Sequence, residues 1–450
     1  MTHLSVHEWG KVLVDTLASD DSFSRPQANQ LLAAARQHPC AQVEATNILV
    51  DHHRYLRARQ VVGVLAAQDC SLEILPKVDP ESPDEAVPVV RSRLLHMLDV
   101  AFKLGLSTGG SAEIARQSAS LLDILIRIFA DRLTAETRRG LPRRYMSDEE
   151  DLSALRGRLD VTRQFTAHAV RPDRVACRFD TLTSDTPLLR IMKACVVFLD
   201  RHARNFETRR RLHELRLVLA DVSDLPVGRL PWGQVRIDRT NRRWESLLSL
   251  AKLFLRRDWQ ATHHRLDSAE GITLLFPMND LFESYVAAQL RRALSDTGIE
   301  VVAQGGRLSC LGEWRAGEKC EGDVFQTRPD ILLKRHGQIV AVIDTKWKAL
   351  AKEPSDRKRG VSQSDVYQMM AYSRIYSCRN LMLLYPATPG TGSRIAKNFG
   401  IHGGHERLTL TRLDLSAEPR DIINSLSSLV QSTIPIQSSQ PSPETPFAYT

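Results

Sequence analysis

The stretch from Arg328 to Lys348, RPDILLKRHGQIVAVIDTKWK, decides how the C-terminal part of this chain folds. Two apolar runs flank the turn at His336-Gly337, a pattern that predicts two antiparallel strands joined as a hairpin. Because side chains alternate along a strand, one face of the second strand should carry Val340, Val342, Asp344, Lys346 and Lys348. That face begins as core and ends in one acid and two amines. Packing alone gives no reason for such an ending, since aspartate is a poor strand former.

A second acid, Asp330, opens the first strand directly after Pro329, where proline is tolerated. Antiparallel pairing around the turn places Asp330 near the level of Asp344, so two carboxylates and the amine of Lys346 should converge at one end of a small sheet. Neighbouring carboxylates repel each other and stay ionised only with a cation between them. Mg²⁺ fits, because it takes one or two carboxylates and keeps waters and phosphate oxygens in its other positions. The set is typical of metal-assisted phosphodiester hydrolysis.

The same residues also allow a structural interpretation. Asp330 would then cap a turn, and Asp344 would end a strand in a surface salt bridge with a lysine. A bare PD or DxK carries little information in a chain of 450 residues. Here PD is followed about fourteen residues later by DxK, with both pieces in strand context, which favours the nuclease interpretation.

Composition describes an ordinary soluble globular protein with room for two or three domains, since 42% of the 450 residues are hydrophobic and 25% are charged. The net charge of +8 favours a polyanionic partner. Seven cysteines without a CxxC pair argue against a zinc ribbon or a disulfide framework. No apolar run approaches 18 residues and the N-terminus lacks a signal-peptide pattern, so we expect no membrane segment and a cytoplasmic location.

The chain divides by pattern into four regions, which gives an α+β or α/β multidomain fold. Residues 1–88 are expected to form a mixed, strand-rich region that docks a partner, and residues 89–265 a mainly helical, basic region. Residues 266–415 should hold the acid-bearing sheet, and residues 416–450, rich in Ser, Pro, Gln and Thr, should be largely disordered. In the basic region arginines alternate with Trp232, Trp244 and Trp259. This pattern suits either nucleic-acid contact or a solvated helix face.

The region from 266 to 415 predicts a definite order of elements. A helix should start near Asn279-Asp280 and carry Glu283 in its first turns, either as an ordinary helix-start acid or as a third acid for the site. A strand at 299–303 and the two acid-bearing strands follow. A second helix, from about 362 to 377, carries Gln368 and a core stripe of Tyr367, Met370, Ala371 and Ile375. With the buried strand at 381–385, the order is that of the PD-(D/E)xK restriction-endonuclease-like core. A basic loop lies between the catalytic strand and the second helix, and we expect its residues to contact DNA: Lys348, Lys352, Arg357, Lys358 and Arg359.

Four C-terminal motifs, FPMNDLFESYV, TRPDILL, VIDTKWK and DVYQMMAYS, together with the upstream segments LEILPKV, GLPRRYMSDEEDLSALRGRLDV and CRFDTLTSDT, resemble the McrC family in order and spacing. McrC is the nuclease subunit of the McrBC modification-dependent restriction systems. The resemblance extends to about residue 416. It implies that Asp330 and Asp344 ligate the metal, that Lys346 is the catalytic lysine, and that Glu283 and Gln368 support them.

The resemblance also implies partners. It predicts an McrB-like AAA+ GTPase subunit that recognises the modified base in double-stranded DNA, with 5-methylcytosine as the expected modification. GTP would then act only through that subunit, because this chain has no GxxxxGK[ST] loop. Two other functions stay open at this point. The chain could be a non-catalytic adaptor that activates an AAA+ motor, or a stand-alone DNA repair nuclease with the same core.

Overall fold

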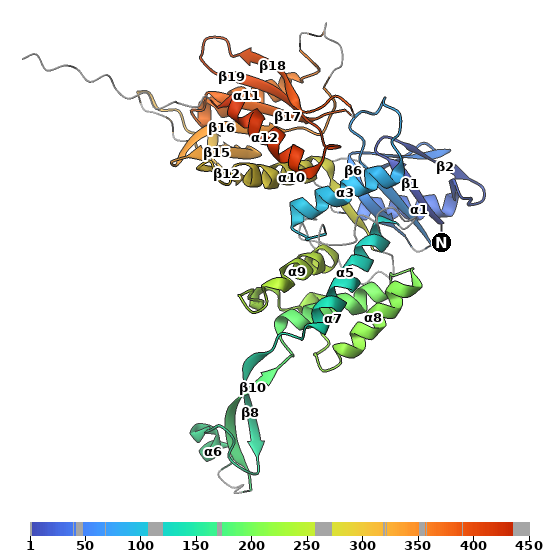
Figure 1. Ribbon diagram of the computed structural model, residues 1–450, viewed down its shortest axis with the longest axis vertical. Coiled ribbons are helices and arrows are strands. Elements are labelled where there is room, and N and C mark those ends of the chain that lie inside the picture. The colour runs from blue at the N-terminus through green and yellow to red at the C-terminus, as the bar shows by residue number, and fades with distance from the viewer. Residues whose placement is uncertain are drawn as a thin grey trace, which may run out of the picture.

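The computed structural model describes residues 2–38, 40–41, 48–67, 69–106, 120–168, 173–256, 272–317, 320, 322–350, 356, 358–388 and 390–434. Within these ranges the chain is a mixed α+β protein with several sheets. An N-terminal part of two sheets lies beside a C-terminal part built on a larger sheet, and a helical part with a projecting arm extends away from both (Figure 1).

Two four-stranded sheets make up the N-terminal part. The first has the order β1 (Thr2–His7), β7 (Cys70–Leu75), β6 (Val61–Ala66) and β11 (Leu274–Pro277), and the second has the order β3 (Ser22–Ser24), β2 (Lys11–Asp15), β5 (Tyr55–Ala58) and β4 (Leu49–Asp51). Helix α1 (Arg25–Gln37) begins at a capping box between Ser24 and Gln27. Its apolar side, including Leu31, closes the core of this part.

Strand β11 joins the N-terminal sheet to the C-terminal part. It pairs antiparallel with β6, and Leu275 lies opposite Gly63. A Cβ atom at Gly63 would lie 1.9 Å from the carbonyl oxygen of Leu274, so only glycine allows the strands to approach this closely. Helix α10 (Met278–Ala293) starts directly after β11. The fourth strand of the N-terminal sheet and the first helix of the C-terminal part are therefore one continuous segment.

The middle part is a bundle of helices that carries a long hairpin. The helices of this bundle are α5 (Leu121–Arg138), α7 (Pro187–Asp200), α8 (Phe206–Val218) and α9 (Glu245–Ala251), followed by a π-helical turn (Lys252–Arg256). Helix α3 (Val87–Phe102) instead packs on α10 and β7, beside the N-terminal sheet (Figure 1). Short 3-10 turns occur at Val227–Arg229, Trp232–Gln234 and Arg242–Trp244. Side-chain caps from Ser120, Thr186 and Asn205 begin three of these helices.

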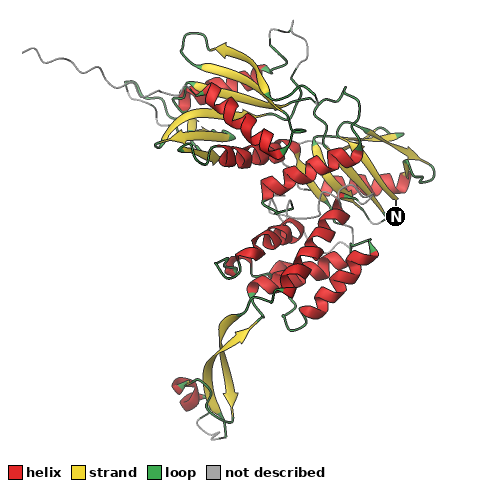
Figure 2. Ribbon diagram, viewed as in Figure 1, coloured by secondary structure: helices red, strands yellow, loops and turns green. Residues whose placement is uncertain are grey.

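The hairpin consists of β8 (Arg144–Leu152) paired antiparallel with β10 (Val175–Thr183), together with β9 (Arg158–Leu159) and α6 (Val161–Thr166). We call residues 144–183 the β8–β10 arm. It projects from the helices at one end of the long axis of the molecule (Figures 1 and 2).

Two of the three tryptophans in the basic region, for which nucleic-acid contact was left open, pack in or against the core. Trp244 is fully buried in the main core, and Trp232 packs against the same core. Neither indole is therefore displayed as a stacking platform, and the third residue, Trp259, lies outside the described residues. The mixture of arginine and tryptophan in this region reflects helices with an apolar inner side and a basic outer side.

The C-terminal part is a six-stranded sheet with the order β12 (Ile299–Ala303), β15 (Ile331–Arg335), β16 (Gln338–Thr345), β17 (Asn380–Pro386), β19 (Arg407–Leu413) and β18 (Arg394–Gly400). The strands β16, β17 and β19 run parallel. Helices α10 and α12 (Pro419–Thr433) share a core with one face of the sheet, and α11 (Gln363–Ile375) packs on the other face. A small separate hairpin, β13 (Ser309–Leu311) with β14 (Val324–Gln326), leads into β15.

The structure corrects two expectations in this part. The segment from 419 to 433, expected to belong to a disordered tail, is the helix α12, whose Leu426 and Val430 are buried. Residues 435–450 lie outside the described residues. The expected core stripe of α11 is also mostly wrong, since Tyr367, Met370 and Ala371 are exposed and only Ile375 of the four packs against a core cluster. The buried side of α11 carries Asp365, Met369, Tyr372 and Ser373, and its polar members hide it from a hydrophobicity pattern.

The helices give no sign of a membrane segment. Among the described residues, none of them is both long and apolar enough to cross a bilayer.

Candidate active site

The hairpin of β15 and β16 brings the two acids of the PD and DxK motifs together. His336 and Gly337, both with positive φ, form the two-residue turn that the sequence predicts. Lys334 pairs with Ile339, but Leu333 pairs with Ala341, so Val340 is an extra residue in a β-bulge. This shift sets Ile331 opposite Ile343. Asp330 therefore lies at the level of Asp344, as expected.

The bulge changes one part of the predicted alternation. Val340 packs against the main core on the α10 side of the sheet, whereas Val342 packs on the α11 side. The carbonyl of the bulged Val340 accepts a hydrogen bond from Asn380 Nδ2 at 3.0 Å. The strand also ends at Thr345, so Lys346 and Lys348 belong to the segment after it. We call residues 346–348 the catalytic segment, because the family resemblance implies that Lys346 is the catalytic lysine.

Asp330 is fixed by the end of the neighbouring strand. The backbone N–H and the hydroxyl of Thr345 both donate to its Oδ2, at 2.7 and 2.8 Å. Burial raises the pKa of Asp330, while these two hydrogen bonds and the nearby Lys346 act in the opposite direction. The hydrogen bonds hold one carboxylate oxygen in place.

Asp344 and Lys346 form a buried ion pair. The Lys346 Nζ atom lies 2.8 Å from Asp344 Oδ2, and the Asp344 side chain is completely buried. Burial, reinforced by the charge of Asp330, raises the pKa of Asp344 to about 7. Burial alone would lower the pKa of Lys346, but the charges of Asp344 and Asp330 raise it above its ordinary value. The lysine therefore keeps its proton.

A chain of hydrogen bonds across α11 orients the lysine. Lys346 Nζ donates to Gln368 Oε1 at 3.3 Å, and Gln368 Nε2 donates to Tyr372 Oη at 2.8 Å. Tyr372 Oη in turn donates to the carbonyl of Arg328 at 3.2 Å, two residues before Asp330. Sequence reasoning found Gln368 but missed Tyr372. Its position four residues after Gln368, on the same side of the helix, is the signal that could have found it.

Helix α10 adds two more acids near Asp330. Burial raises the pKa of Glu283 to about 8, and the charge of Asp330 contributes to the shift. Burial also raises the pKa of Asp280, with a smaller opposing effect from Arg328. Asp280 was not predicted as a site residue, although it lies one helical turn before Glu283. The site thus combines a carboxylate-rich side with a single oriented lysine.

The donor set fits a divalent cation. Asp344 Oδ1 is buried and has no hydrogen-bond partner among the described residues, although the like charge of Asp330 lies nearby. Among all the residues that the structure describes, no group of three or more His, Cys, Asp or Glu side chains is arranged to hold a metal. Mg²⁺ does not need such a group, because one or two carboxylates and several waters satisfy it. Asp330 and Asp344 are two neighbouring carboxylates that fit this requirement.

The residues expected to contact DNA are only partly placed. Lys352 and Arg357 lie outside the described residues, Lys358 is exposed, and Arg359 is half-buried. Lys348 forms an ion pair with Asp365 at 2.5 Å. This ion pair balances the charge of Lys348 within the protein, and its expected DNA contact stays a prediction.

A basic pair near this loop was missed by the sequence reasoning. Arg394 of β18 lies directly opposite Arg412 of β19. Arg412 Nη2 donates to the carbonyl of Leu350, just after the catalytic segment, at 3.4 Å. Only the strand register reveals this pair, because the two arginines are far apart in the sequence and neither belongs to a motif.

Together, the fold and the site define a mixed α+β protein with a buried carboxylate–lysine cluster at the end of its largest sheet. The chain belongs to the McrBC 5-methylcytosine restriction system component family, whose model matches residues 56–386. This range contains both acid-bearing strands and α11, and the match confirms the resemblance found from the motifs.

Solved structures show the same overall fold. One is a half-complex from the tetradecameric assembly of Thermococcus gammatolerans McrB AAA+ hexamers with bound McrC, which matches at 20% identity and a TM-score of 0.67 over 95% of this chain and 100% of that chain. A cryo-EM structure of the Thermococcus gammatolerans McrBC complex matches at 22% identity and a TM-score of 0.53, over 65% of this chain and 88% of that chain. No match was found among curated proteins.

Proposed function

We propose that this chain is a Mg²⁺-dependent DNA endonuclease of the PD-(D/E)xK type and the nuclease subunit of a GTP-dependent restriction complex specific for modified cytosine. The observation that carries the proposal is the buried carboxyl group of Asp344, which has Asp330 beside it, Lys346 at 2.8 Å, and one oxygen without a hydrogen-bond partner in the described part of the chain. Such a pair of acids is unfavourable by itself and is stabilised by a cation.

Asp330 and Asp344 would hold the cation. When bound, it would supply Lewis-acid polarisation of the phosphate and a lower pKa for a bound water. Thr345 prepares Asp330 for this role by fixing its Oδ2 with two hydrogen bonds. The geometry of the acids thus depends on the strand end rather than on a flexible loop.

Lys346 would act on the reacting groups. Its raised pKa keeps it charged, and Gln368 and Tyr372 restrict where the amine can go. A fixed positive charge at this place can orient the attacking water or neutralise the negative charge that develops on the phosphate. Glu283, whose pKa of about 8 leaves it largely protonated near neutral pH, would support the site without adding another full negative charge.

The proposed partner is an McrB-like AAA+ GTPase that acts with this chain on double-stranded DNA. Two observations support it: the related solved structure contains McrC bound to McrB AAA+ hexamers, and this chain has no GxxxxGK[ST] loop for a nucleotide of its own. GTP would therefore act only through the partner.

We place the docking surface on the β8–β10 arm rather than in residues 1–88, where the sequence pattern puts it. Its exposed apolar side chains include Tyr145 and Phe165, which are 74% and 73% exposed, and Leu182. Tyr145 and Leu182 lie opposite each other at the base of the arm, and Phe165 belongs to α6 at its far end (Figure 1). Exposed aromatic groups in such a position are typical of a protein-binding surface.

One reconstitution tests the proposal against both alternatives. The purified chain, with and without the GTPase, is incubated with methylated DNA in Mg²⁺ or EDTA, and cleavage and GTP turnover are measured together. We expect cleavage only with both proteins, GTP and Mg²⁺. Cleavage without the partner would instead favour a stand-alone nuclease, and stimulated GTP turnover without any cleavage would favour an adaptor.

A further inference from the structure

Trp347, in the centre of the catalytic segment, is held from several directions. Its indole Nε1–H donates to Glu8 Oε2 at 2.9 Å, and its backbone N–H donates to Asn279 Oδ1 at 3.2 Å. The ring of Phe282 packs edge-on against the indole, with ring centroids 5.4 Å apart. Trp347 is almost fully buried. The position of its neighbour Lys346 is therefore tied to these contacts.

Glu8 follows β1 directly and is anchored in the N-terminal sheet. Its backbone N–H donates to the carbonyl of Leu75 at 2.8 Å, and its Oε2 also accepts the backbone N–H of Lys77 at 3.0 Å. The side chain is completely buried, and its Oε1 has no hydrogen-bond partner among the described residues. A buried carboxyl group is costly for stability. Packing of the sheet does not require one at this position.

The second attachment of Trp347 comes from the same sheet by another route. Asn279 and Phe282 stand in the first turns of α10, directly after β11. The N–H of Met278 donates to the carbonyl of Gln60, next to β6, at 3.2 Å. The start of α10 is thus fixed to the β6–β11 side of the sheet, while Glu8 is fixed to the β1–β7 side.

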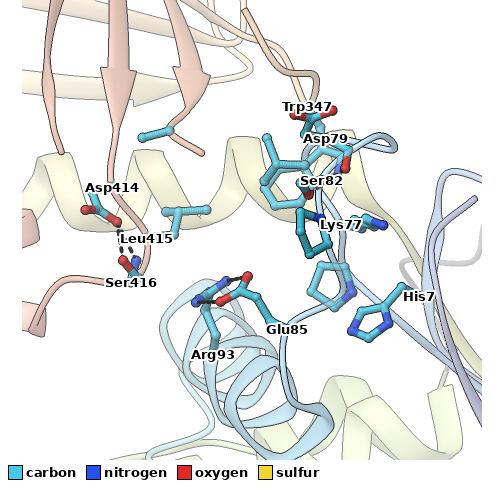
Figure 3. Close-up of a pocket in the computed structure, with 14 residues that line it drawn as sticks. His7, Lys77, Asp79, Ser82, Glu85, Arg93, Trp347, Asp414, Leu415 and Ser416 are labelled. Atoms are coloured by element: carbon cyan, nitrogen blue, oxygen red, sulfur yellow. Dashed lines mark hydrogen bonds and ion pairs between the residues drawn. The ribbon is translucent and has the colours of Figure 1, made fainter. Parts of the chain in front are cut away.

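A pocket opens beside Trp347 where the two parts of the molecule meet. Its lining includes His7, Lys77 and Arg93 from the N-terminal side and Trp347 and Asp414 from the C-terminal side (Figure 3). The parts do not pack solidly at this place. The hydrogen bond from Trp347 to Glu8 therefore links the C-terminal part to the N-terminal part at a place where the two are not closely packed.

We propose that Glu8 is a positioning residue for the nuclease reaction, and that it acts through Trp347 to set the place of Lys346. The inference rests on the proposed function. Its physical basis is that a misplacement of about 1 Å in a catalytic group can reduce a rate by roughly a hundredfold. The N-terminal sheet, which contains none of the site's acids or its lysine, would then control how well the catalytic lysine is aligned.

The test is a double-mutant cycle in the full chain with its GTPase partner. Glu8→Ala and Trp347→Phe each remove the hydrogen bond, and phenylalanine keeps a ring against Phe282. We expect each to lower kcat for DNA cleavage about tenfold, with KM for DNA and GTP turnover unchanged, and the double variant to be no slower than the single variants. Unchanged kcat, or effects that multiply in the double variant, would overturn the proposal.

Two further variants separate positioning from general weakening. Ser5→Ala is the matched control, because Ser5 lies in β1, the strand that Glu8 directly follows, and the variant loses a hydrogen bond to Glu73 at 2.6 Å without touching Trp347. We expect it to cleave like the wild type, and an equal loss in this variant would contradict the positioning role. Glu8→Gln keeps a carbonyl acceptor for the indole, so it should restore most of the kcat that Glu8→Ala loses.

A readout without cleavage keeps the inference distinct from the proposed function. In an NMR spectrum of the full chain labelled with ¹⁵N-tryptophan, the indole N–H signal of Trp347 is assigned by its absence in Trp347→Phe. Glu8→Ala should shift this signal and speed its exchange with solvent, whereas Ser5→Ala should not. If the wild type fails to cleave DNA, the proposed nuclease function fails. An unmoved indole signal in Glu8→Ala would sink the positioning role.

Discussion

At the scale of single residues, Asp344 is the position where charge and function are most directly linked. Asp344→Asn keeps the size of the side chain but removes the charge that would hold the cation. We expect cleavage by the reconstituted complex to fall about a thousandfold or more, since metal polarisation supplies several kcal/mol of transition-state stabilisation. Lys346→Ala should also abolish cleavage, but it should leave metal binding largely intact.

The control for both variants is GTP turnover measured in the same tube. Partner binding and stimulated GTP hydrolysis should survive, because we assign docking to the β8–β10 arm, which contains no residue of the candidate active site. Wild-type cleavage by Asp344→Asn would remove the nuclease assignment. Loss of cleavage and GTP stimulation together would instead indicate that the end of β16 has a structural role.

Glu8 gives a pH prediction at the same scale. Burial raises its pKa to about 8, far above the ordinary value of a glutamate. The folded state therefore binds a proton that the unfolded state releases, so the stability from this group is complete at acidic pH and is lost as the pH rises through about 8. The loss amounts to about 1.4 kcal/mol for each pH unit between the two pKa values.

The measurement for Glu8 compares Tm at pH 6 and pH 9. Glu8→Gln cannot ionise, so its Tm should fall less than that of the wild type between these two values. An identical fall in the two proteins would contradict a raised pKa for this group.

Local patterns in the sequence predicted only some of the residues of the candidate active site. Strand alternation and hairpin pairing, which are short-range regularities, predicted that Asp330, Asp344 and Lys346 lie together, whereas Gln368 followed from the family resemblance. Other members of the site were missed, since they depend on contacts between distant segments: Glu8 reaches Trp347 across more than three hundred positions, and Tyr372 reaches the carbonyl of Arg328.

At the scale of elements, the bulge in β16 and the polar side of α11 mark the limits of periodic patterns. A perfect alternation assigns Val340 to the face of Val342, but the extra residue turns it to the opposite core. In α11 the buried Asp365 pairs with Lys348, so the sequence of the helix does not show its inner side as a row of apolar residues. The Asp365–Lys348 pair lies beside the candidate active site, where local rules are most often broken for function. The bulge lies four residues before Asp344 and sets the register of the two acids.

The β8–β10 arm provides the element-scale prediction. Tyr145, Phe165 and Leu182 are exposed, and in the described part of the chain the three core clusters include no residue of the arm. Replacing all three by serine should leave Tm nearly unchanged, since these side chains bury little apolar surface. The same variant should lose most stimulation of the GTPase. Normal binding and stimulation would exclude the arm as the docking surface.

A matched control for the arm uses exposed apolar residues elsewhere. Phe206 and Leu217 of α8 are 76% and 78% exposed and lie outside the arm. Replacing these two by serine should leave GTPase stimulation at the wild-type level. An equal loss in both sets would indicate a nonspecific effect of surface hydrophobicity.

At the scale of the whole molecule, charge on the C-terminal part predicts where DNA lies. Arg394 and Arg412 lie directly opposite each other across β18 and β19, so two positive charges are gathered at one edge of the largest sheet. Neutralising both to glutamine should weaken DNA binding and reduce the slope of log affinity against log salt by roughly one for each phosphate that the protein no longer neutralises. Arg209→Gln, an exposed arginine of α8, is the control. An unchanged slope in the double variant would show that this edge does not touch DNA.

The last prediction concerns how far the docking and nuclease functions can be separated physically. A boundary near residue 265 follows from sequence pattern, yet β11 at Leu274–Pro277 completes the N-terminal sheet and α10 shares a core with α3. A fragment of residues 1–265 would expose the edge of β6 and the apolar surface that α10 covers, and both favour aggregation. A fragment of residues 1–294 keeps β11 and α10, so it should be the more soluble of the two and have the higher Tm. Equal solubility and Tm for the two fragments would show that the shared core contributes little to stability. In that case fragments would separate docking from cleavage as well as point variants such as Asp344→Asn do.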